Sequence, residues 1–128
     1  MQPRIRLTLS QDGLDCCEYT LNKRGRYVIG RSRDCDIRVT GDGISRHHCL
    51  LAFDPPRLRL RDMGSRNGTF LNGELVGQRG QEEPLSDTAL EDFMDHEVND
   101  GNVLRVGSLT FHVHVVDPSA VHEALHIW

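Results

Sequence analysis

Apolar and polar residues alternate in short runs along most of the chain, with turn signals such as Gln11-Asp12-Gly13 and Asn72-Gly73 between them. Alternation with a period of two puts successive side chains on opposite faces of a strand, so each run predicts a strand with one buried face. The runs cover residues 4–9, 17–21, 26–29, 36–39, 49–53, 58–61, 69–71, 74–76, 102–106 and 109–116. Together they predict an all-β fold, an antiparallel β-sandwich of about 10–11 short strands.

Two segments depart from this alternation. Residues 86–97 combine apolar side chains with Ser86 or Asp87 as a cap, which favours a short helix. Residues 118–128 place three apolar side chains at helical spacing, which predicts either a second short helix packed on the sandwich or the beginning of a further segment that this sequence omits. We therefore expect one domain over residues 1–117 and a separate C-terminal tail.

Length and charge narrow the class of protein. The 128 residues suffice for one hydrophobic core but not for two. The net charge is −4 and the 15 basic residues are spread along the chain, so the clustered basic patch of a nucleic-acid-binding protein is missing. The N-terminus lacks a signal-peptide core, and no apolar run has the length of a membrane helix. We expect a cytoplasmic protein that binds neither nucleic acid nor membrane.

Charge is distributed unevenly, because residues 81–100 hold eight acidic side chains and no lysine or arginine. The rest of the chain, with 15 basic and 11 acidic residues, carries a net charge of +4. The simplest interpretation is a solvated acidic insertion. Alternatively, it screens a basic site elsewhere in the domain, or Thr88 is a phosphoacceptor that a second copy of the chain recognises.

Cysteine and histidine do not suggest a metal site or an enzyme. The four cysteines show no CxxC spacing, and the Asn67-Gly68-Thr69 sequon lacks a secretory context, so we expect free thiols and no glycan. His112 and His114 share a strand face, and His122 and His126 are four residues apart, but no further ligand pattern completes a zinc site. With no nucleophile–base pair and no Walker loop either, we expect no cofactor, no metal and no catalysis.

Three polar clusters stand where one alternation ends and the next begins, so each predicts a loop. They are Gly30-Arg31-Ser32-Arg33, Ser45-Arg46-His47-His48 and Gly64-Ser65-Arg66-Asn67-Gly68-Thr69. A guanidinium fork matches the oxygens of a phosphate, and a serine in a turn adds a hydroxyl and an N–H. An asparagine amide suits a peptide backbone. Taken singly, each residue could be an ordinary turn residue or a solvated charge; their order and spacing are more specific.

That order resembles the forkhead-associated (FHA) family of phosphothreonine-peptide readers. The family pattern is Gly-Arg, then Ser-x-x-His, then Asp-x-x-Ser-x-Asn-Gly-Thr-x-x-Asn-Gly. The chain matches it with Gly30-Arg31, with the cluster from Ser45 to His48, and with the stretch from Asp62 to Gly73. The flanking strands extend the resemblance to residues 4–116, which implies an FHA/SMAD-like sandwich.

The resemblance also implies a role for each matching position. Arg31, Ser45 and Arg66 would contact the phosphate, and Asn67 would bind the ligand main chain. The positions that would support the geometry of the site are Gly30, His48, Gly68, Thr69 and Asn72. Those at its periphery would be Arg46, His47 and Ser65.

These roles predict a non-enzymatic, phosphothreonine-dependent protein-binding module in Ser/Thr phosphorylation signalling. Its partner would be a phosphothreonine segment written by a Ser/Thr kinase. One alternative is an FHA scaffold that associates or oligomerises without phosphate. A more remote one is a metal enzyme built on the histidines.

Overall fold

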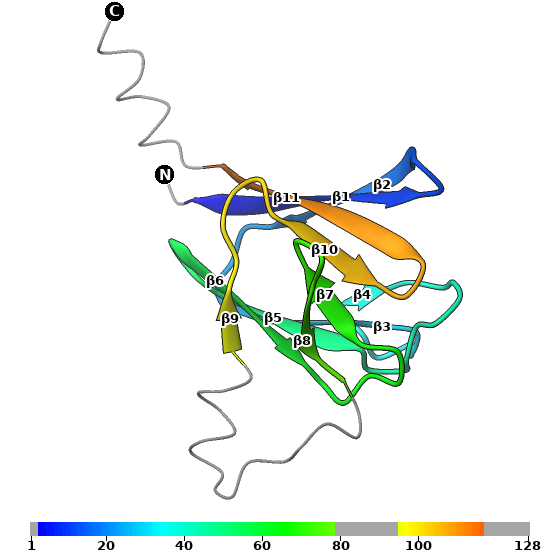
Figure 1. Cartoon of the computed structure of the whole chain (residues 1–128). Coiled ribbons are helices and arrows are strands. Elements are labelled where there is room, and N and C mark those ends of the chain that lie inside the picture. The colour runs from blue at the N-terminus through cyan, green and yellow to red at the C-terminus, as the bar shows by residue number, and fades with distance from the viewer. Residues whose placement is uncertain (1–2, 79–94, 117–128) are drawn as a thin grey trace, which may run out of the picture.

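Two β-sheets stack face to face around one hydrophobic core (Figure 1). The computed structural model describes residues 3–78 and 95–116. One sheet has six strands in the order β2-β1-β11-β10-β7-β8, and the other has five in the order β4-β3-β5-β6-β9. The strands are β1 (Arg4–Gln11), β2 (Leu14–Leu21), β3 (Gly25–Gly30), β4 (Ile37–Arg38), β5 (Cys49–Asp54), β6 (Arg57–Asp62), β7 (Thr69–Leu71), β8 (Glu74–Gly77), β9 (Asp95–Glu97), β10 (Val103–Val106) and β11 (Leu109–Val116). The predicted all-β sandwich is confirmed.

The described ladders are antiparallel except that between β3 and β4, which is parallel and joins Ile29 to Ile37. Tight turns set the register of the antiparallel hairpins. In the β7–β8 turn Asn72 and Gly73 have φ values of 51° and 84°. Positive φ at both central residues is what a type I′ hairpin requires, so the Asn-Gly pair explains this connection.

The core follows from the alternation in the sequence. Along β1 the side chains of Ile5 and Leu7 are fully buried, whereas Arg4 and Arg6 are exposed. The five-stranded sheet contributes large buried side chains such as Phe53 on its facing side. Full burial of one such side chain contributes about 1.5–3 kcal/mol, so the core is what holds the two sheets together.

The prediction of a helix over residues 86–97 is wrong at its last three residues, which form β9. This strand pairs with β6 in the register Arg59↔Glu97 and Arg61↔Asp95, where it satisfies the backbone groups of an edge that would otherwise be unpaired. The rest of the predicted helix, and the helix predicted in the tail, lie outside the described residues. Within the described part no helix is long and apolar enough to cross a membrane.

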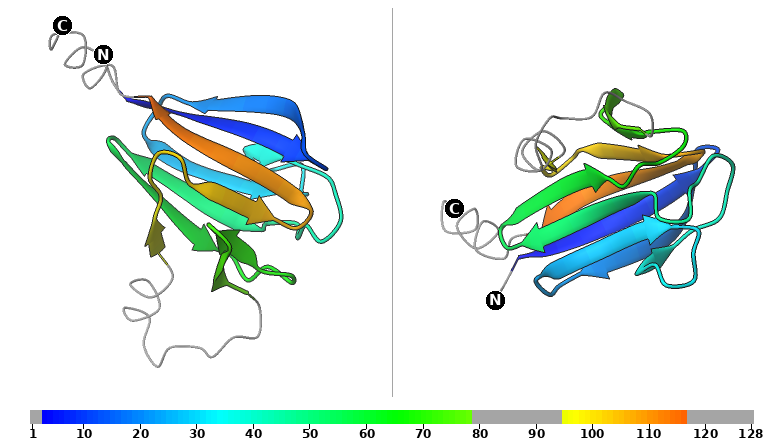
Figure 2. Two further views of the ribbon diagram at one scale, coloured as in Figure 1. Left: turned by 45° about the horizontal axis from the view of Figure 1, so that its top comes forward. Right: turned by 90° about the horizontal axis from the view of Figure 1, so that it is seen from below.

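The loops that follow β3, β4 and β6 meet at one end of the sandwich, away from the end where β1 starts and β11 stops (Figure 2). The three polar clusters of the sequence lie in these loops. All four cysteines are free, as predicted, with two exposed on β2 and two buried.

Candidate functional site

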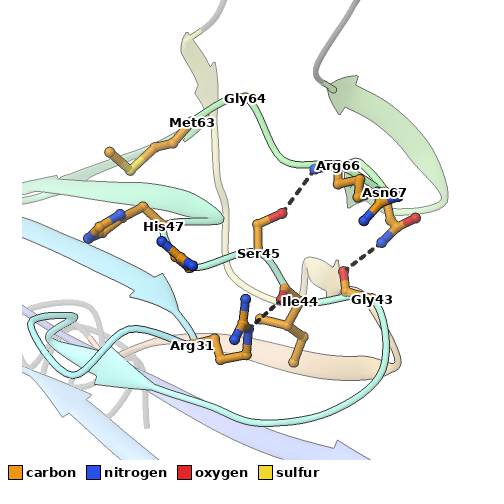
Figure 3. Close-up of a pocket in the computed structure, with 10 residues that line it drawn as sticks. Arg31, Gly43, Ile44, Ser45, His47, Met63, Gly64, Arg66 and Asn67 are labelled. Carbon is orange, nitrogen blue, oxygen red and sulfur yellow. Dashed lines mark hydrogen bonds between the residues drawn. The ribbon is translucent and has the colours of Figure 1, made fainter.

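The three loops enclose an open hollow, and most of the polar residues singled out in the sequence line it (Figure 3). Its walls come from segments that are far apart in the sequence. The lining residues are Arg31, Gly43, Ile44, Ser45, Arg46, His47, Met63, Gly64, Arg66 and Asn67. The fold therefore brings together Arg31, Ser45, Arg66 and Asn67, the four residues predicted to bind a ligand.

Arg31 follows the last residue of β3 and is fixed at both its backbone and its side chain. Its backbone N–H donates to the Ser45 carbonyl at 3.1 Å, and its Nε donates to the Ile44 carbonyl at 3.3 Å. These bonds orient the guanidinium and leave its two terminal amino groups for a ligand. Among the ion pairs of the described residues, none involves Arg31 or Arg66. Two arginines beside one hollow thus lack a carboxylate partner within residues 3–78 and 95–116.

Ser45 lies at the centre of the hollow, where its hydroxyl oxygen accepts a hydrogen bond from the Arg66 backbone N–H at 2.9 Å (Figure 3). A hydroxyl has one donor in addition to its acceptor pairs. The contact with Arg66 uses an acceptor pair, so the Ser45 O–H remains available to an anion. The same bond ties the loop after β4 to the loop after β6.

His48 is fully buried beneath the hollow and joins the same two loops. Its Nδ1 accepts the Ser45 backbone N–H at 3.1 Å, so its Nε2 carries the proton and donates to the Gly68 carbonyl at 2.9 Å. Burial lowers the pKa of His48 against the opposing effect of the Gly68 carbonyl. The neutral ring is therefore the form that fits between the loops, as a buttress rather than as a lining residue.

Asp62 is a second buried polar residue, only 2% exposed, and it organises the loop after β6. One of its oxygens accepts the backbone N–H groups of Gly64 and Ser65 at 2.9 and 3.0 Å. The other accepts the hydroxyl of Thr69 at 2.6 Å and that of Ser65. A buried carboxylate with four donors is well satisfied, and it fixes the loop that carries Arg66. Sequence reasoning assigned Asp62 no role, although the Asp-x-x-Ser spacing is a signal for such a turn.

Two glycines are required by close approach of the backbone. A Cβ on Gly30 would lie 2.1 Å from the Arg46 carbonyl oxygen, so only glycine lets the loops after β3 and β4 come together here. Gly68 has φ +91°, and a Cβ there would lie 2.7 Å from a Leu75 methyl. Both glycines therefore shape the loops around the hollow but are not among its lining residues.

Asn67 bridges two loops, since its Nδ2 donates to the Gly43 carbonyl at 3.2 Å. Its amide oxygen faces no described donor in this arrangement and can accept from a peptide N–H. Asn72 does not line the hollow. It exchanges hydrogen bonds with Val103 through its backbone N–H and its side-chain oxygen, at 2.8 Å each, and so ties the β7–β8 turn to β10.

The three residues predicted at the periphery occupy different places. Arg46 and His47 line the hollow, and His47 Nε2 lies 2.9 and 3.0 Å from the two carboxylate oxygens of Asp34. Hydrogen bonds from Ser32 and from His47 lower the pKa of Asp34. Ser65 is instead fully buried and faces Asp62 beneath the loop.

Met63 is a lining residue that sequence reasoning missed. Its side chain is 43% exposed and forms one edge of the hollow, while its backbone N–H donates to the His48 carbonyl at 3.0 Å (Figure 3). An exposed methionine offers an adaptable apolar contact for a ligand side chain. The only signal for it in the sequence is its position inside the Asp62–Gly73 stretch.

The fold and the hollow define the class of protein first: a β-sandwich whose loops at one end form an open, polar hollow lined by arginines. A family model narrows this class, because the model of the FHA domain matches residues 27–90. The chain belongs to the FHA family, whose members are non-catalytic, phosphothreonine-dependent peptide-binding modules. The alternative of a histidine-based metal enzyme is therefore wrong.

Two proteins of similar sequence support the assignment to the FHA family. The chain is 35% identical over 85 residues to the ABC transporter ATP-binding/permease protein Rv1747 of Mycobacterium tuberculosis, a match that covers 66% of this chain and 8% of that protein. It is 28% identical over 85 residues to the FHA domain-containing protein FhaA of the same organism, covering 66% of this chain and 13% of FhaA. The chain thus corresponds to a small part of each of these proteins.

Solved structures agree with the fold. An FHA domain from an analysis of phosphothreonine-dependent FHA domain interactions is 27% identical with a TM-score of 0.69, covering 89% of this chain and 98% of that one. The FhaA FHA domain in complex with the intracellular domain of Rv3910 is also 27% identical, with a TM-score of 0.66 and coverage of 86% and 99%. The likeness extends over nearly the whole of both domains.

Proposed function

We propose that the hollow binds the phosphothreonine of another protein, with Arg31, Ser45 and Arg66 at the phosphate and Asn67 at the peptide main chain. This proposal rests on one observation. Arg31 and Arg66 stand beside the same hollow without a carboxylate partner among the described ion pairs. Cations left unpaired around an open hollow favour an anionic ligand.

The chemistry of each group suits a phosphate. A phosphothreonine carries a charge of about −1.5 to −2 at pH 7 and three strong acceptor oxygens. The Arg31 fork can bond two of them, and the Ser45 hydroxyl can donate to a third, in charge-assisted bonds roughly twice as strong as neutral ones. Because Ser45 and the Arg31 side chain are already held by neighbouring loops, little side-chain entropy is lost on binding.

The partner that we propose is a threonine segment phosphorylated by a Ser/Thr kinase, in the cytoplasm where such kinases act. The FhaA domain, which is similar to this chain, was solved in complex with the intracellular domain of Rv3910. That complex supports a protein segment rather than a free phosphate as the ligand. Asn67, whose amide oxygen faces no described donor, would hold the main chain of such a segment.

A degenerate phosphothreonine peptide library, titrated against its unphosphorylated twin by fluorescence anisotropy, tests the proposal. We expect saturable binding of the phosphorylated library and none of its twin at the same concentration. A library with phosphoserine in the same place measures the preference for threonine. Equal binding of the phosphorylated and unphosphorylated libraries would refute phosphate recognition.

The edge strand β2 supports the alternative of association without phosphate. It lies at the end of its sheet, and Leu14 is 74% exposed there. An open edge with an apolar side chain can pair with another chain. Sedimentation of the unphosphorylated protein tests this. A concentration-dependent dimer that Leu14→Lys disrupts would support the alternative, and a monomer at all concentrations would refute it.

A second copy of this chain phosphorylated at Thr88 is a further candidate ligand. Thr88 lies outside the described residues, so this candidate rests on the sequence of the acidic segment alone. Kinase treatment followed by sedimentation provides the test. Self-association that appears after treatment and is lost in Thr88→Ala would support it; unchanged labelling and association in that variant would refute it.

A further inference from the structure

Asp34, Cys35 and His47 form a cluster of three different metal-ligating side chains beside the hollow. The first two lie in the loop after β3 and the third in the loop after β4. One ligand atom from each, a carboxylate oxygen, the thiol sulfur and an imidazole nitrogen, lies within 4.8 Å of the other two. Asp34 and His47 are exposed, whereas Cys35 is only 9% exposed. The cluster thus has a buried sulfur below and two ligands open to solvent above.

Backbone contacts hold the two loops that carry these side chains. The Ser32 N–H donates to the Arg46 carbonyl at 3.0 Å, and the Cys35 N–H donates to the Ser32 carbonyl at 3.1 Å. The Cys35 thiol donates to the same Arg46 carbonyl at 3.1 Å. The absence of a Cβ on Gly30 permits this approach. The position of the sulfur relative to the loop that carries His47 is therefore set by the fold.

The spacing is close to what a tetrahedral metal site needs. Zinc lies about 2.3 Å from sulfur and about 2.0–2.2 Å from nitrogen or oxygen, so its ligand atoms are roughly 3.3–3.6 Å apart. The distance between His47 Nε2 and Asp34 Oδ1 is 2.9 Å and would lengthen slightly on metal binding. Distances of up to 4.8 Å between the other ligand atoms would shorten by about 1 Å.

We propose that Asp34, Cys35 and His47 bind a divalent transition metal ion of the zinc type, with water in the fourth position. Thiolate and imidazole ligands select zinc and its neighbours over magnesium and calcium. On binding, the Cys35 thiol gives up its hydrogen bond to the Arg46 carbonyl and releases its proton to solvent. The His47 ring loses the proton that its Nε2 shares with Asp34 and stays neutral with its proton on Nδ1, so that the hydrogen bond between Asp34 and His47 is replaced by two bonds to the metal. The three residues match no zinc spacing in the sequence, which is why sequence analysis predicted no metal.

Charge balance makes this site compatible with the arginines around it. The loops also contain Arg31 and Arg46, which repel a free dication. The Cys35 thiolate and the Asp34 carboxylate neutralise the two charges of the metal, so the occupied cluster is neutral as a whole. Arg38 turns its Nε to the Arg31 carbonyl instead of to Asp34, so the described partners of this carboxylate are Ser32 and His47 rather than an arginine.

Cobalt and zinc titrations of the full chain, reduced and without a polyhistidine tag, test the proposal. We expect Co²⁺ to produce a thiolate-to-cobalt charge-transfer band and the strong visible bands of a four-coordinate site, and Zn²⁺ to bleach both. The Cys35→Ser variant should lose the charge-transfer band, since serine keeps the donor to Arg46 but not the thiolate. Asp34→Asn and His47→Gln should each weaken zinc binding at least about tenfold, because even supporting residues of metal sites have effects of this size.

Two control variants separate this cluster from other ligands on the surface. Cys16→Ser with Cys17→Ser removes the exposed thiols, and His112→Gln with His114→Gln removes the histidine pair on β11. Both double variants should bind zinc like the parent chain.

Absence of the cobalt bands from the parent chain would overturn the proposal, as would bands that vanish in either control. If Cys35→Ser fails to fold, unchanged zinc affinity in both Asp34→Asn and His47→Gln would also overturn it. No phosphopeptide enters the experiment, so its failure is distinct from failure of the proposed function.

Discussion

Arginines lie on two surfaces of the sandwich, and their interaction partners differ between the two. On the outer side of the five-stranded sheet Arg24 pairs with Asp54 at 2.9 Å and Arg61 with Asp95 at 2.7 Å. In the hollow, Arg31 is held by a carbonyl and has no carboxylate partner among the described ion pairs. An arginine paired with an acid is already neutralised. The number of arginines on a surface therefore does not identify an anion site, but their pairing does.

The two surfaces also differ in what shapes them. The outer face of the five-stranded sheet is a regular ladder between β5, β6 and β9. The hollow consists of irregular loops, whose backbone groups bond to the buried side chains of His48 and Asp62. The sheet face depends on strand pairing, whereas the hollow depends on a few buried polar groups. Variants in the two regions should have different consequences.

Loss of the carboxylate in Asp62→Ala should have the largest effect on stability. It leaves four donors under the loop without their acceptor, and we expect the free energy of unfolding to fall by about 3 kcal/mol. Urea denaturation measures the change. Asp54→Ala, which removes an exposed acid from the sheet face, is the matched control and should change little. Equal losses in the two variants would contradict the distinction between the regions.

Arg31→Ala should have the largest effect on binding. The variant removes the guanidinium that would pair with the phosphate, and loss of one partner of such a charge pair costs about 2–5 kcal/mol of binding free energy. The dissociation constant of a phosphothreonine peptide should therefore rise roughly 30-fold or more. Isothermal titration calorimetry measures it. The control is Arg59→Ala, an exposed arginine on β6, which should change the affinity less than about twofold. Similar affinities for the two variants would remove Arg31 from the site.

Ser45→Ala should have a smaller effect on binding than Arg31→Ala. The variant loses one hydrogen bond to the phosphate and the acceptor for the Arg66 N–H, so we expect a loss of about tenfold, or about 1.4 kcal/mol. Thermal unfolding of the same variant shows whether the loop connection also matters for stability. Full affinity in Ser45→Ala would mean that its hydroxyl faces only the protein.

The sheet-face pairs should show the smallest effects. Arg61→Ala breaks a half-buried pair and should lower the free energy of unfolding by about 0.5–1 kcal/mol, without changing phosphopeptide affinity. Arg24→Ala breaks a pair whose side chains are 75% and 70% exposed, and its unfolding curve should overlay that of the parent. A weakened phosphopeptide affinity in either variant would extend the anion site onto the sheet.

The sequence predicted well those parts of the fold that alternate, such as β1 and the β7–β8 hairpin. It failed at β9, because the Asp95–Glu97 segment has no apolar alternation and its place in the sheet comes from backbone pairing with β6. The apolar residues before it suggested a helix that ends at residue 97. Local periodicity cannot predict a strand that forms only because its backbone pairs with an open sheet edge.

The residues around the candidate site show a similar limit. The order of the three clusters was enough to expect Arg31, Ser45 and Arg66 near one another, and the structure places them around one hollow. The order of the clusters did not identify Asp62 as the hydrogen-bond acceptor that fixes the loop after β6, or Met63 as a residue that lines the hollow. Both roles depend on the conformation of that loop. The cluster of Asp34, Cys35 and His47 depends on the meeting of two loops and is invisible in the sequence.

An NMR titration of the isotopically labelled chain tests whether the hollow binds phosphothreonine, using the tightest-binding phosphothreonine peptide and its unphosphorylated twin. We expect that only the phosphorylated peptide shifts backbone amide signals, and that the largest shifts fall on residues 31, 43–47 and 64–67. Shifts of the same size with both peptides, or shifts centred on β2 or on the face of β6 and β9, would contradict it.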